Sequence, residues 1–439
     1  MRVRIRTVIA AVGSALTIMV ACCFLLYPGF ATIRMLRDPG VRATGQPSDL
    51  PEQFRALSRR YLEWANGALA SRRLETVAQG DVAATEWPLF GTIFFLTTAE
   101  QLVREGKLTV DDEMRASLSR AAEVVVHPAT ATWVRKRWGA TYLERENVFY
   151  RMLVVMGLSS FERATGDRRH HAWQEAQAQS LSRELLAAPY HLADDYPDEC
   201  YPTDVLWAVV AARRALGDTC CNELTAGLMT VLDGRLRDGN GLPAFSVDSR
   251  TAQIRQGPRG SGNSGILSFA GELNPKVAAH WYKSYVDDYW VDGFIKGFRE
   301  VPKGAQAVAD VDSGLVLFDI GSVASVFGIG AARANGRYDH ASALSQEVFA
   351  ASWPTPFGLL IPGLLGYFAS EGWCFGELAL SFALTRPNYV AATTPSDGSV
   401  PRVVWLFLCF YLGTGFLLII REYVYWRKRL VVRVKGAHR

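Results

Sequence analysis

The segment Asp198-Glu-Cys-Tyr-Pro-Thr-Asp204 is followed by Val205-Leu-Trp-Ala-Val-Val-Ala-Ala-Arg-Arg-Ala-Leu216, so a polar cluster directly precedes an apolar run. A proline is tolerated in the first turn of a helix, because its missing N–H would have no partner there. The free N–H groups of a helix start also favour anions and lower the pKa of a thiol. The segment therefore predicts a buried helix that begins at the rim of a pocket. A charged cap on an ordinary core helix is the alternative.

The same alternation of polar and apolar segments recurs with helical periodicity throughout residues 50–385. Amphipathic, charged segments lie near 52–72, 111–125, 168–187, 219–236, 276–298 and 337–351. More uniformly apolar segments lie between them, near 87–104, 146–163, 202–216, 263–273, 312–335 and 371–385. Helices with one exposed face that alternate with fully buried helices are typical of an all-α (α/α)6 toroid, or barrel, in which an outer ring surrounds an inner ring.

The apolar segments all begin with polar or aromatic residues. The openings are Glu86-Trp-Pro88, Glu146-Asn147, the 198–204 segment, Arg259-Gly-Ser-Gly-Asn263, Asp310-Val-Asp-Ser313 and Glu371-Gly-Trp373. Helix capping explains Ser, Asp or Asn at such positions, but it does not explain the arginine, the thiol and the tryptophans. In a toroid these ends meet, and the sequence therefore predicts one central functional cavity.

Carboxylates dominate this predicted cavity. The acidic residues at the helix starts are Glu86, Glu146, Asp198, Glu199, Asp204, Asp310, Asp312 and Glu371. Crowded acids separate one another's pKa values, so that one carboxyl serves as a general acid while another serves as a base. Glycoside cleavage and elimination both need such a pair. We predict that the catalytic residues are among Asp204, Asp310, Asp312, Cys200 and Glu199.

A second set of residues at the helix starts is expected to bind a substrate: Trp87, Asn147, Tyr150, Tyr201, Arg259, Asn263 and Trp373. The aromatic members, together with Trp281, would offer stacking faces to a sugar or a hydrophobic chain, although a core position is the commoner explanation for any one of them. The histidines do not lie at the helix starts, and no zinc-type spacing, phosphate loop or dinucleotide fingerprint is present. The sequence therefore predicts no metal and no cofactor.

Two uncharged segments stand apart from this pattern, from Thr7 to Ile33 and from Val403 to Ile420. Each is long enough to cross a bilayer, which takes roughly 18–20 apolar residues. We expect three regions: residues 1–33 as a basic start and a transmembrane helix, 34–400 as the main domain, and 401–439 as a second transmembrane helix with a basic tail. A cleaved signal peptide or a lipoprotein-type signal (Met19-Val-Ala-Cys22) is the alternative for the first segment, but its apolar run continues through Tyr27.

The positive-inside rule places both basic ends in the cytoplasm and the main domain outside, in the bacterial periplasm. The chain has a net charge of +4, but the two ends carry +9 and the remainder −5. This distribution indicates a lipid bilayer as a partner, through anionic headgroups, and argues against nucleic acid. A small molecule or a glycan is the expected substrate, and a second copy or an envelope-complex protein is a further candidate partner. Four cysteines (Cys200, Cys220, Cys221, Cys374) would face an oxidising compartment, where Cys200 could bond Cys220 or Cys221.

Several motifs of the chain resemble the linalool dehydratase-isomerase family. Glu144-Arg-Glu-Asn-Val-Phe-Tyr150, Ala164-Thr-Gly-Asp-Arg-Arg169 and Glu199-Cys-Tyr-Pro202 follow one another in the family's order. Leu273-Asn-Pro275 and Asp310-Val-Asp-Ser-Gly314 extend the resemblance over roughly residues 85–340. The resemblance implies an (α/α)6 fold that faces the periplasm, and a cofactor-independent lyase or isomerase of small terpene alcohols.

The chain departs from the family's pattern in the residues that carry its chemistry. Cys200 matches the first of two family cysteines, but Val209 stands at the second, Leu153 at the histidine and Ser261 at a tyrosine. The Asp310/Asp312 pair is retained. The resemblance therefore implies a membrane-anchored relative with altered chemistry, because the acid–base partners of the thiol are missing.

Three functions follow from these observations. The first is an acid–base hydrolase or lyase acting on a glycan or polyprenyl-linked substrate, with Asp204, Asp310 or Asp312 as acid and base. The second is a family-like lyase or isomerase acting on an isoprenoid alcohol, with participation of Cys200 and Tyr201. The third is a non-catalytic cell-envelope scaffold.

Overall fold

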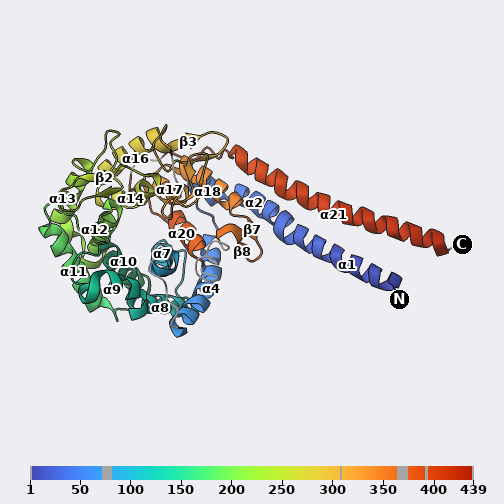
Figure 1. Cartoon of the computed structure of the whole chain (residues 1–439), viewed down its shortest axis with the longest axis horizontal. Coiled ribbons are helices and arrows are strands. Elements are labelled where there is room, and N and C mark those ends of the chain that lie inside the picture. Colours follow the sequence, from blue (N-terminus) through green and yellow to red (C-terminus); the bar gives the residue numbers. More distant parts are fainter. Residues whose placement is uncertain (1, 72–81, 307–308, 363–373, 391–393, 438–439) are drawn as a thin grey trace.

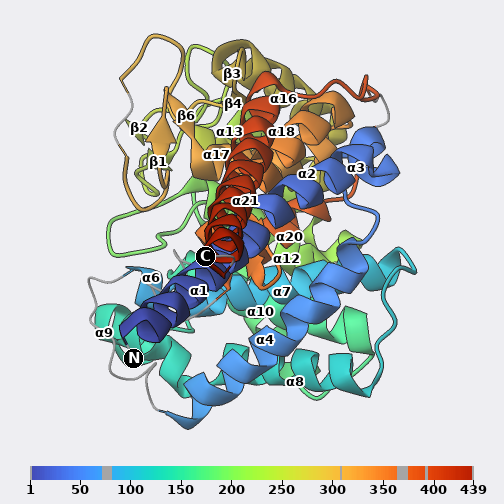
Figure 2. The same cartoon turned by 90° about the vertical axis from the view of Figure 1, so that its right-hand side faces the viewer.

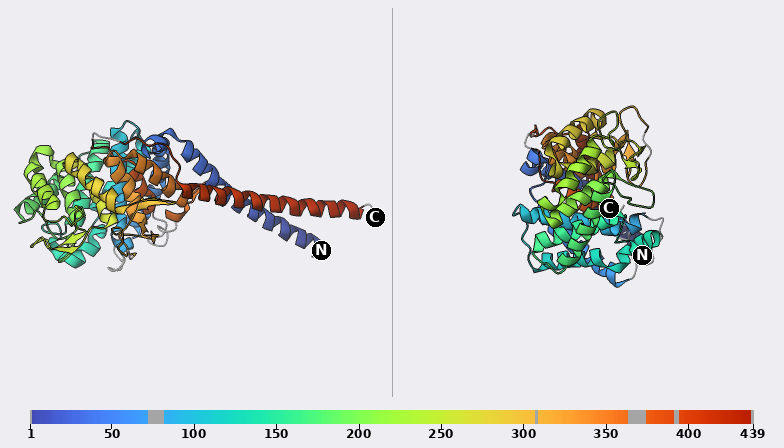
Figure 3. Two further views of the ribbon diagram at one scale, coloured as in Figure 1. Left: turned by 90° about the horizontal axis from the view of Figure 1, so that it is seen from above. Right: turned by 90° about the vertical axis from the view of Figure 1, so that its left-hand side faces the viewer.

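A computed structural model of the chain describes residues 2–71, 82–306, 309–362, 374–390 and 394–437. It is mostly helical, and it consists of a main body from which two long terminal helices extend side by side (Figures 1 and 3). The predicted all-helical character is thus confirmed in outline. Short two-stranded hairpins, which the sequence did not reveal, occur between the helices.

Six helices form the centre of the main body. They are α7 (Trp87–Arg104), α10 (Val148–Thr165), α12 (Pro202–Leu216), α14 (Gly260–Leu267), α17 (Ser322–Ala334) and α20 (Phe375–Leu384). Each packs against the next in the order given, and α20 packs against α7. The contacts among the six helices therefore close into a cycle.

Six further helices pack against the central ones. They are α4 (Leu50–Ala70), α8 (Asp112–Val126), α11 (His171–Ala187), α13 (Asn222–Asp233), α16 (Pro275–Tyr289) and α18 (Tyr338–Ala351). For example, α8 contacts α7 and α10, α11 contacts α10 and α12, and α18 contacts α17. Figure 1 shows these helices around the central ones, and Figure 2 shows the main body from the side of the terminal helices.

The two sets of helices differ in burial as their sequences predict, except that α18, predicted to be half-exposed, has nine of its fourteen residues buried. The buried residues of α11 are Gln174, Ala178, Leu181 and Leu185, which share one face at helical spacing. In α7, by contrast, fourteen of the eighteen residues are buried, so the helix has no wet face. Helices of the second kind need neighbours on every side, and this requirement drives the central packing.

Connecting elements complete the main body. They are α3 (Pro39–Thr44), α6 (Val82–Thr85), α9 (Thr132–Trp138), α15 (Ala270–Leu273) and the antiparallel pairs β1 (Ser246–Val247) with β2 (Ile254–Gln256), β3 (Trp290–Asp292) with β4 (Lys296–Phe298), β5 (Val316–Leu317) with β6 (Ile320–Gly321), and β7 (Pro354–Thr355) with β8 (Gly358–Leu359). Short 3-10 turns lie at Pro128–Ala131, Gly139–Thr141 and Asp218–Cys221.

Three predicted helices have clearly different bounds. The segment 276–298 is helical only to Tyr289, because β3 and β4 form a hairpin over residues 290–298. The apolar segment 312–335 becomes helical only at Ser322, because residues 310–321 form a turn and the β5–β6 hairpin. The segment 263–273 is two helices, α14 and α15, separated at Ser268 and Phe269.

A buried polar network joins the C-terminal ends of the central helices. Arg214 in α12 donates to Glu272 in α15 through Nε and Nη2, at 2.8 and 2.6 Å. Tyr389 donates to the same carboxylate at 2.7 Å, and Glu100 in α7 lies 3.7 Å from the Arg214 guanidinium. The side chain of Arg214 is only 6% exposed. The network therefore satisfies charges that would otherwise destabilise the interior.

The terminal segments form two helices that are long and apolar enough to cross a membrane, over Thr7–Arg37 and Arg402–Arg429. The first consists of α1 (Arg2–Ala21), a π-helical turn at Cys22–Leu26, and α2 (Tyr27–Arg37). The second is α21 (Arg402–Ala437), which packs along α1 and α2. Both chain ends lie at the same far end of this pair (Figure 3). The helices extend beyond the predicted apolar segments at both ends.

Candidate functional site

The loop before α12 is held by its own side chains. Asp195 Oδ2 accepts a hydrogen bond at 2.6 Å from the backbone N–H of Tyr201, the residue directly before α12. Tyr196 and Glu199 exchange backbone hydrogen bonds, and Asp198 takes the positive φ (63°) that this tight turn requires. The backbone of Cys200 forms an isolated antiparallel β-bridge with the backbone of Val247 in β1. The polar segment that opens the helix is thus a rigid turn.

Three carboxyl groups from separate parts of the chain interact electrostatically near the start of α12. Asp204 is in the first turn of α12, Glu86 directly precedes α7, and Asp312 is in the turn that precedes β5. Burial raises the pKa of Asp204 to about 8, and the carboxylates of Asp312 and Glu86 add to the increase. Asp204 and Glu86 are half-buried, and Asp312 is accessible to solvent. We call Glu86, Asp204 and Asp312 the acid cluster.

The other two members of the acid cluster also hold their protons more firmly than free carboxyl groups. Burial raises the pKa of Glu86 to about 7, although a hydrogen bond from Tyr196 and the charge of Arg137 oppose the increase. The surrounding protein raises the pKa of Asp312, and the neighbouring carboxylate of Asp310 contributes to this shift. Near neutral pH Asp204 therefore keeps its proton, whereas Glu86 is divided between its protonated and ionised forms.

Arg259, directly before α14, anchors the turn that carries Asp312. Its Nη1 and Nη2 donate to the two oxygens of Asp310 at 2.8 Å each, and its Nε donates to Glu300 at 2.7 Å. Ser261 also donates to Glu300, at 2.8 Å. Burial alone would raise the pKa of Asp310, but the bonds from Arg259 lower it. Asp310 therefore stays ionised and positions the turn, whereas Asp312 is left without a bidentate partner.

Aromatic groups adjoin the acid cluster. The Tyr201 hydroxyl donates to Glu199 at 3.0 Å, and its ring meets Phe245 edge-on at 5.3 Å between centroids. The guanidinium of Arg259 lies 4.5 Å above the Phe245 ring. Trp87, which directly follows Glu86, stacks on Phe375 with 4.6 Å between the ring centroids. These faces are available to a ring or chain of a substrate, because Tyr201 and Trp87 are only half-buried.

Cys200 is buried and is not part of a disulfide bond. Burial raises the pKa of its thiol well above the usual value, and the carboxylates of Asp195, Asp194 and Asp204 add to this effect. The thiolate is the nucleophilic form of cysteine, so these surroundings disfavour a nucleophilic role. The bond to Cys221 that the sequence left open is not formed, and the side chain of Cys220 lies outside the described residues.

Several predicted residues lie away from the acid cluster. Tyr150 is fully buried between Trp133 and Tyr142, and Trp281 is buried with its Nε1 donating to Asp233 at 2.8 Å. Asn147 binds the carbonyl of Tyr142 at 2.8 Å, at a positive φ of 52°. These three side chains have structural contacts in place of the expected position in the central cavity.

The remaining predicted residues have other positions. Asn263 is buried, and its Nδ2 donates to the carbonyls of Pro243 and Arg259. Burial raises the pKa of Glu146, and the charges of Asp194 and Glu184 add to the increase. The acid cluster is not among the main causes of this shift. Trp373 and Glu371 lie outside the described residues.

Three residues that contribute to the site were not predicted: Asp195, Tyr196 and Glu300. All three lie in connections between helices, where periodicity gives no signal. Asp195 is fully buried, and its Oδ1 has no hydrogen-bond partner in the described part of the chain. Burial and the charge of Asp204 raise its pKa well above the usual value, so Asp195 belongs electrostatically with the acid cluster.

No protein-family model matches the chain, and no curated protein matches it.

Gly260 is expected to be essential for the geometry of this site. A Cβ at this position would lie 1.9 Å from the backbone oxygen of Arg299, which is far inside contact distance. Gly260→Ala should therefore displace α14 from the segment that carries Glu300, with a loss of roughly 2–4 kcal/mol in unfolding free energy, measured by thermal or chemical denaturation.

Gly67→Ala in α4 is the matched control, because a Cβ there would meet nothing within 4 Å. Alanine is the better helix former by about 1 kcal/mol, so this variant should be as stable as the wild type or more stable. Equal stability of the two variants would contradict the close approach at Gly260.

Proposed function

We propose that the main body is an (α/α)6 toroid whose central helices begin around one functional site. The closed cycle of contacts among α7, α10, α12, α14, α17 and α20 supports this architecture. The convergence of the acid cluster from the starts of α7 and α12 and from the turn before β5 supports the position of the site. The likeness to the linalool dehydratase-isomerase family remains a proposal that rests on the motifs of the sequence.

The acid cluster supports acid–base cleavage of a carbon–oxygen bond. Asp204, with a pKa of about 8, keeps its proton at neutral pH and donates it to the departing oxygen. Asp312, which is accessible to solvent, takes the proton of an attacking water in hydrolysis, or a proton from the adjacent carbon in elimination. In both reactions one proton leaves the protein and one enters it, so no redox cofactor is required. This pairing of acid and base is the observation that carries the proposed function.

The proposed substrate is a glycan or a polyprenyl-linked molecule at the outer face of the cytoplasmic membrane. The two membrane-length helices at the chain ends support a membrane anchor with the main body on one side of it. The basic residues at both ends favour the cytoplasm for the termini, and therefore the periplasm for the main body. The half-buried Tyr201 and Trp87 provide faces for a sugar ring.

A second candidate is a lyase or isomerase of a small isoprenoid alcohol. The free thiol of Cys200 beside Asp195 and Asp204 favours it, because a disulfide would have removed this group from chemistry. The same first step applies, since protonation of a hydroxyl by Asp204 would release water from an allylic alcohol.

A substrate panel distinguishes these functions. The full chain in lipid nanodiscs is incubated with polyprenyl-linked oligosaccharides, free oligosaccharides and allylic terpene alcohols, and products are identified by mass spectrometry. We expect turnover of the polyprenyl-linked glycan, and a decrease of about 100-fold or more for Asp312→Asn.

Asp287→Asn in α16 is the control, because Asp287 is exposed and pairs only with Lys283. It should retain wild-type turnover. Turnover of the terpene alcohol alone would support the second candidate. Turnover that Asp312→Asn leaves intact would contradict the assigned base, and binding of a partner protein without turnover of any substrate would support the scaffold.

A further inference from the structure

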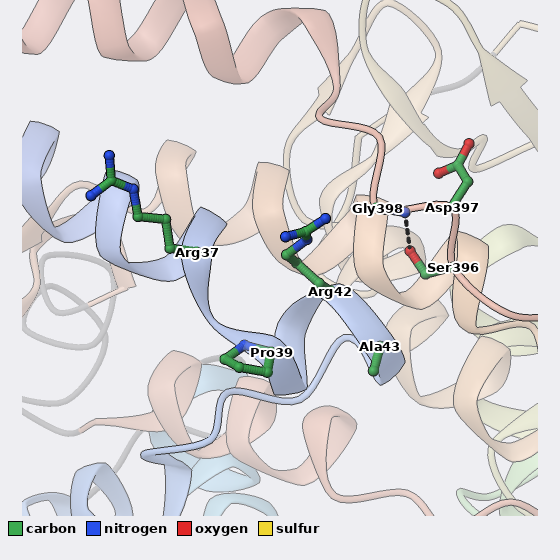
Figure 4. A pocket seen from close by; sticks show the side chains of 7 residues that line it. All are labelled: Arg37, Pro39, Arg42, Ala43, Ser396, Asp397 and Gly398. Carbon is green, nitrogen blue, oxygen red and sulfur yellow. Dashed lines mark hydrogen bonds between the residues drawn. The ribbon is translucent and has the colours of Figure 1, made fainter.

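Two adjoining pockets lie where the terminal helices meet the main body. The first has a volume of about 360 Å³ and is lined by Arg37, Pro39, Arg42, Ala43, Ser396, Asp397 and Gly398 (Figure 4). The second has a volume of about 480 Å³ and is lined by Phe30, Ile33, Arg34, Arg37 and Asp38. Arg37 lines both pockets, and we call the two pockets together the hollow.

Three arginines line the hollow, of which Arg34 is paired with an acid and the other two, among the described residues, are not. The Asp38 carboxylate accepts hydrogen bonds from the N–H groups of Val41 and Ser48, and Asp49 pairs with Arg34 at 2.9 Å. Within the described part of the chain, Arg37 and Arg42 form no ion pair. Both side chains are exposed. The guanidinium groups of Arg37 and Arg42 can therefore donate to an anion, although the carboxylates of Asp38 and Asp397 also line the hollow.

The turn Ser396–Gly398 brings backbone and hydroxyl groups to the same place. Ser396 Oγ accepts the N–H of Gly398 at 3.1 Å, and Gly398 has a φ of +68°. A Cβ at Gly398 would lie 3.2 Å from the Arg42 guanidinium, so the turn is in contact with that side chain. The Asp397 carboxylate accepts a hydrogen bond from the backbone N–H of Ser399 at 2.8 Å. Arg42 is thus held at the rim of the first pocket.

Polarity changes along the hollow in the direction of the membrane-length helices. Phe30 and Ile33 lie on the side of α2 that precedes Arg37, and Phe30 is 55% exposed. Arg37 is the last residue of the first membrane-length helix, and Arg402 is the first residue of the second. The apolar side chains of Phe30 and Ile33 suit contact with an acyl chain, and the guanidinium groups of Arg37 and Arg42 suit contact with a lipid phosphate.

This hollow is separate from the acid cluster. Arg333, in the last turn of α17, donates to the carbonyl of Thr44 at 2.7 Å, so α3 lies at the C-terminal end of the central helices. The acid cluster lies at their N-terminal ends. A ligand in the hollow would therefore lie apart from the proposed catalytic groups.

We propose that Arg37 and Arg42 bind the phosphate of an anionic phospholipid whose acyl chain lies along Phe30 and Ile33. The proposal rests on the membrane placement of the proposed function, but not on its chemistry. Guanidinium groups suit this ligand, because they donate to phosphate oxygens in a bidentate manner. Such a lipid would fix the junction of α2, α3 and the 396–398 turn at the membrane surface.

The test measures binding of fluorescent phosphatidylglycerol to the full chain in neutral detergent, with phosphatidylcholine as the comparison. We expect preference for phosphatidylglycerol in the wild type and about tenfold weaker binding in the Arg37→Ala/Arg42→Ala variant. Arg37→Lys/Arg42→Lys keeps the charge without the bidentate geometry and should show an intermediate loss. Arg183→Ala/Lys276→Ala removes two exposed charges from the outer helices α11 and α16 and should bind as the wild type does.

Three outcomes would overturn the proposal. They are equal binding by the alanine variant and the wild type, equal loss in the Arg183→Ala/Lys276→Ala control, and displacement of phosphatidylglycerol by an equal concentration of inorganic phosphate. Flotation with phosphatidylcholine vesicles reports separately on membrane anchoring. If the wild type fails to float, the membrane placement is wrong whatever the lipid preference.

Discussion

Replacing Asp204 with asparagine is expected to stabilise the protein considerably more at about pH 9 than at about pH 5. The pKa of Asp204 is about 8 in the folded protein, well above that of a free carboxyl group. Such a group favours folding while it is protonated, and this contribution is lost as the pH rises through the folded pKa. At about pH 9 the wild type must keep an ionised carboxylate beside Asp312 and Glu86, and asparagine removes this cost.

We expect a gain on the order of 1–2 kcal/mol at about pH 9, measured by chemical denaturation in detergent at both pH values. The same variant should lose turnover by about 100-fold or more, because asparagine has the shape of the acid but no proton to donate. Increased stability with lost activity would mark Asp204 as a residue kept for function.

Asp218→Asn is the control for this variant. Asp218 has an 85% exposed side chain, and its pair with Arg213 is at the surface, so its replacement should change neither the pH dependence nor the turnover. A stability gain that is equal at both pH values would contradict the raised pKa of Asp204. A fully active Asp204→Asn variant would contradict its role as the acid.

Replacing Arg214 with methionine is expected to cause the largest loss of stability. The substitution leaves the Glu272 carboxylate inside the protein without the guanidinium that donates to both its oxygens. Burial alone would raise the pKa of Glu272, but Arg214 lowers it to about 2. Breaking a buried pair in this way costs about 3–5 kcal/mol. Thermal and chemical denaturation at neutral pH would measure this loss.

The neighbouring arginine offers a matched comparison. Arg213 pairs at 3.2 Å with the exposed Asp218 and donates to the backbone carbonyl of Glu272 at 3.2 Å, but it leaves no buried charge behind, so Arg213→Met should cost only about 1–2 kcal/mol. The double variant Arg214→Met/Glu272→Met should recover part of the loss, since removing both charges leaves no buried ion without a partner. Similar losses for Arg213→Met and Arg214→Met would show that the pair with Glu272 does not hold the central helices together.

Sequence periodicity predicted the helices well because their two patterns of burial differ strongly. A single buried stripe, as at Gln174, Ala178, Leu181 and Leu185, identifies an outer helix such as α11 without any tertiary information. The late start of α17 was not predictable in this way. Phe318 and Asp319 adopt positive φ values in the β5–β6 hairpin, which is rare for phenylalanine, so the sequence gives no clear signal of this turn.

The candidate site was predictable where it lies at helix starts and not where it lies in loops. Asp204 and Asp312 were predicted and do influence each other, because both directly adjoin recognisable apolar segments. Tyr150 packs against Trp133 and Tyr142, contacts that the sequence could not predict, because periodicity does not tell which neighbours meet each face of a helix buried on all sides. Asp195 and Glu300 were missed, since their importance comes from contacts with Tyr201 and Arg259 that are distant in sequence or made by the backbone.

The protonation state of Asp204 is the most direct test of the acid–base site. Infrared difference spectroscopy between the wild type and Asp204→Asn isolates the signal of this one carboxyl group. We predict a protonated carboxylic acid band at pH 6 that disappears around pH 8, as the folded pKa requires. An Asp204 that is already ionised at pH 6 would contradict the proposed mechanism.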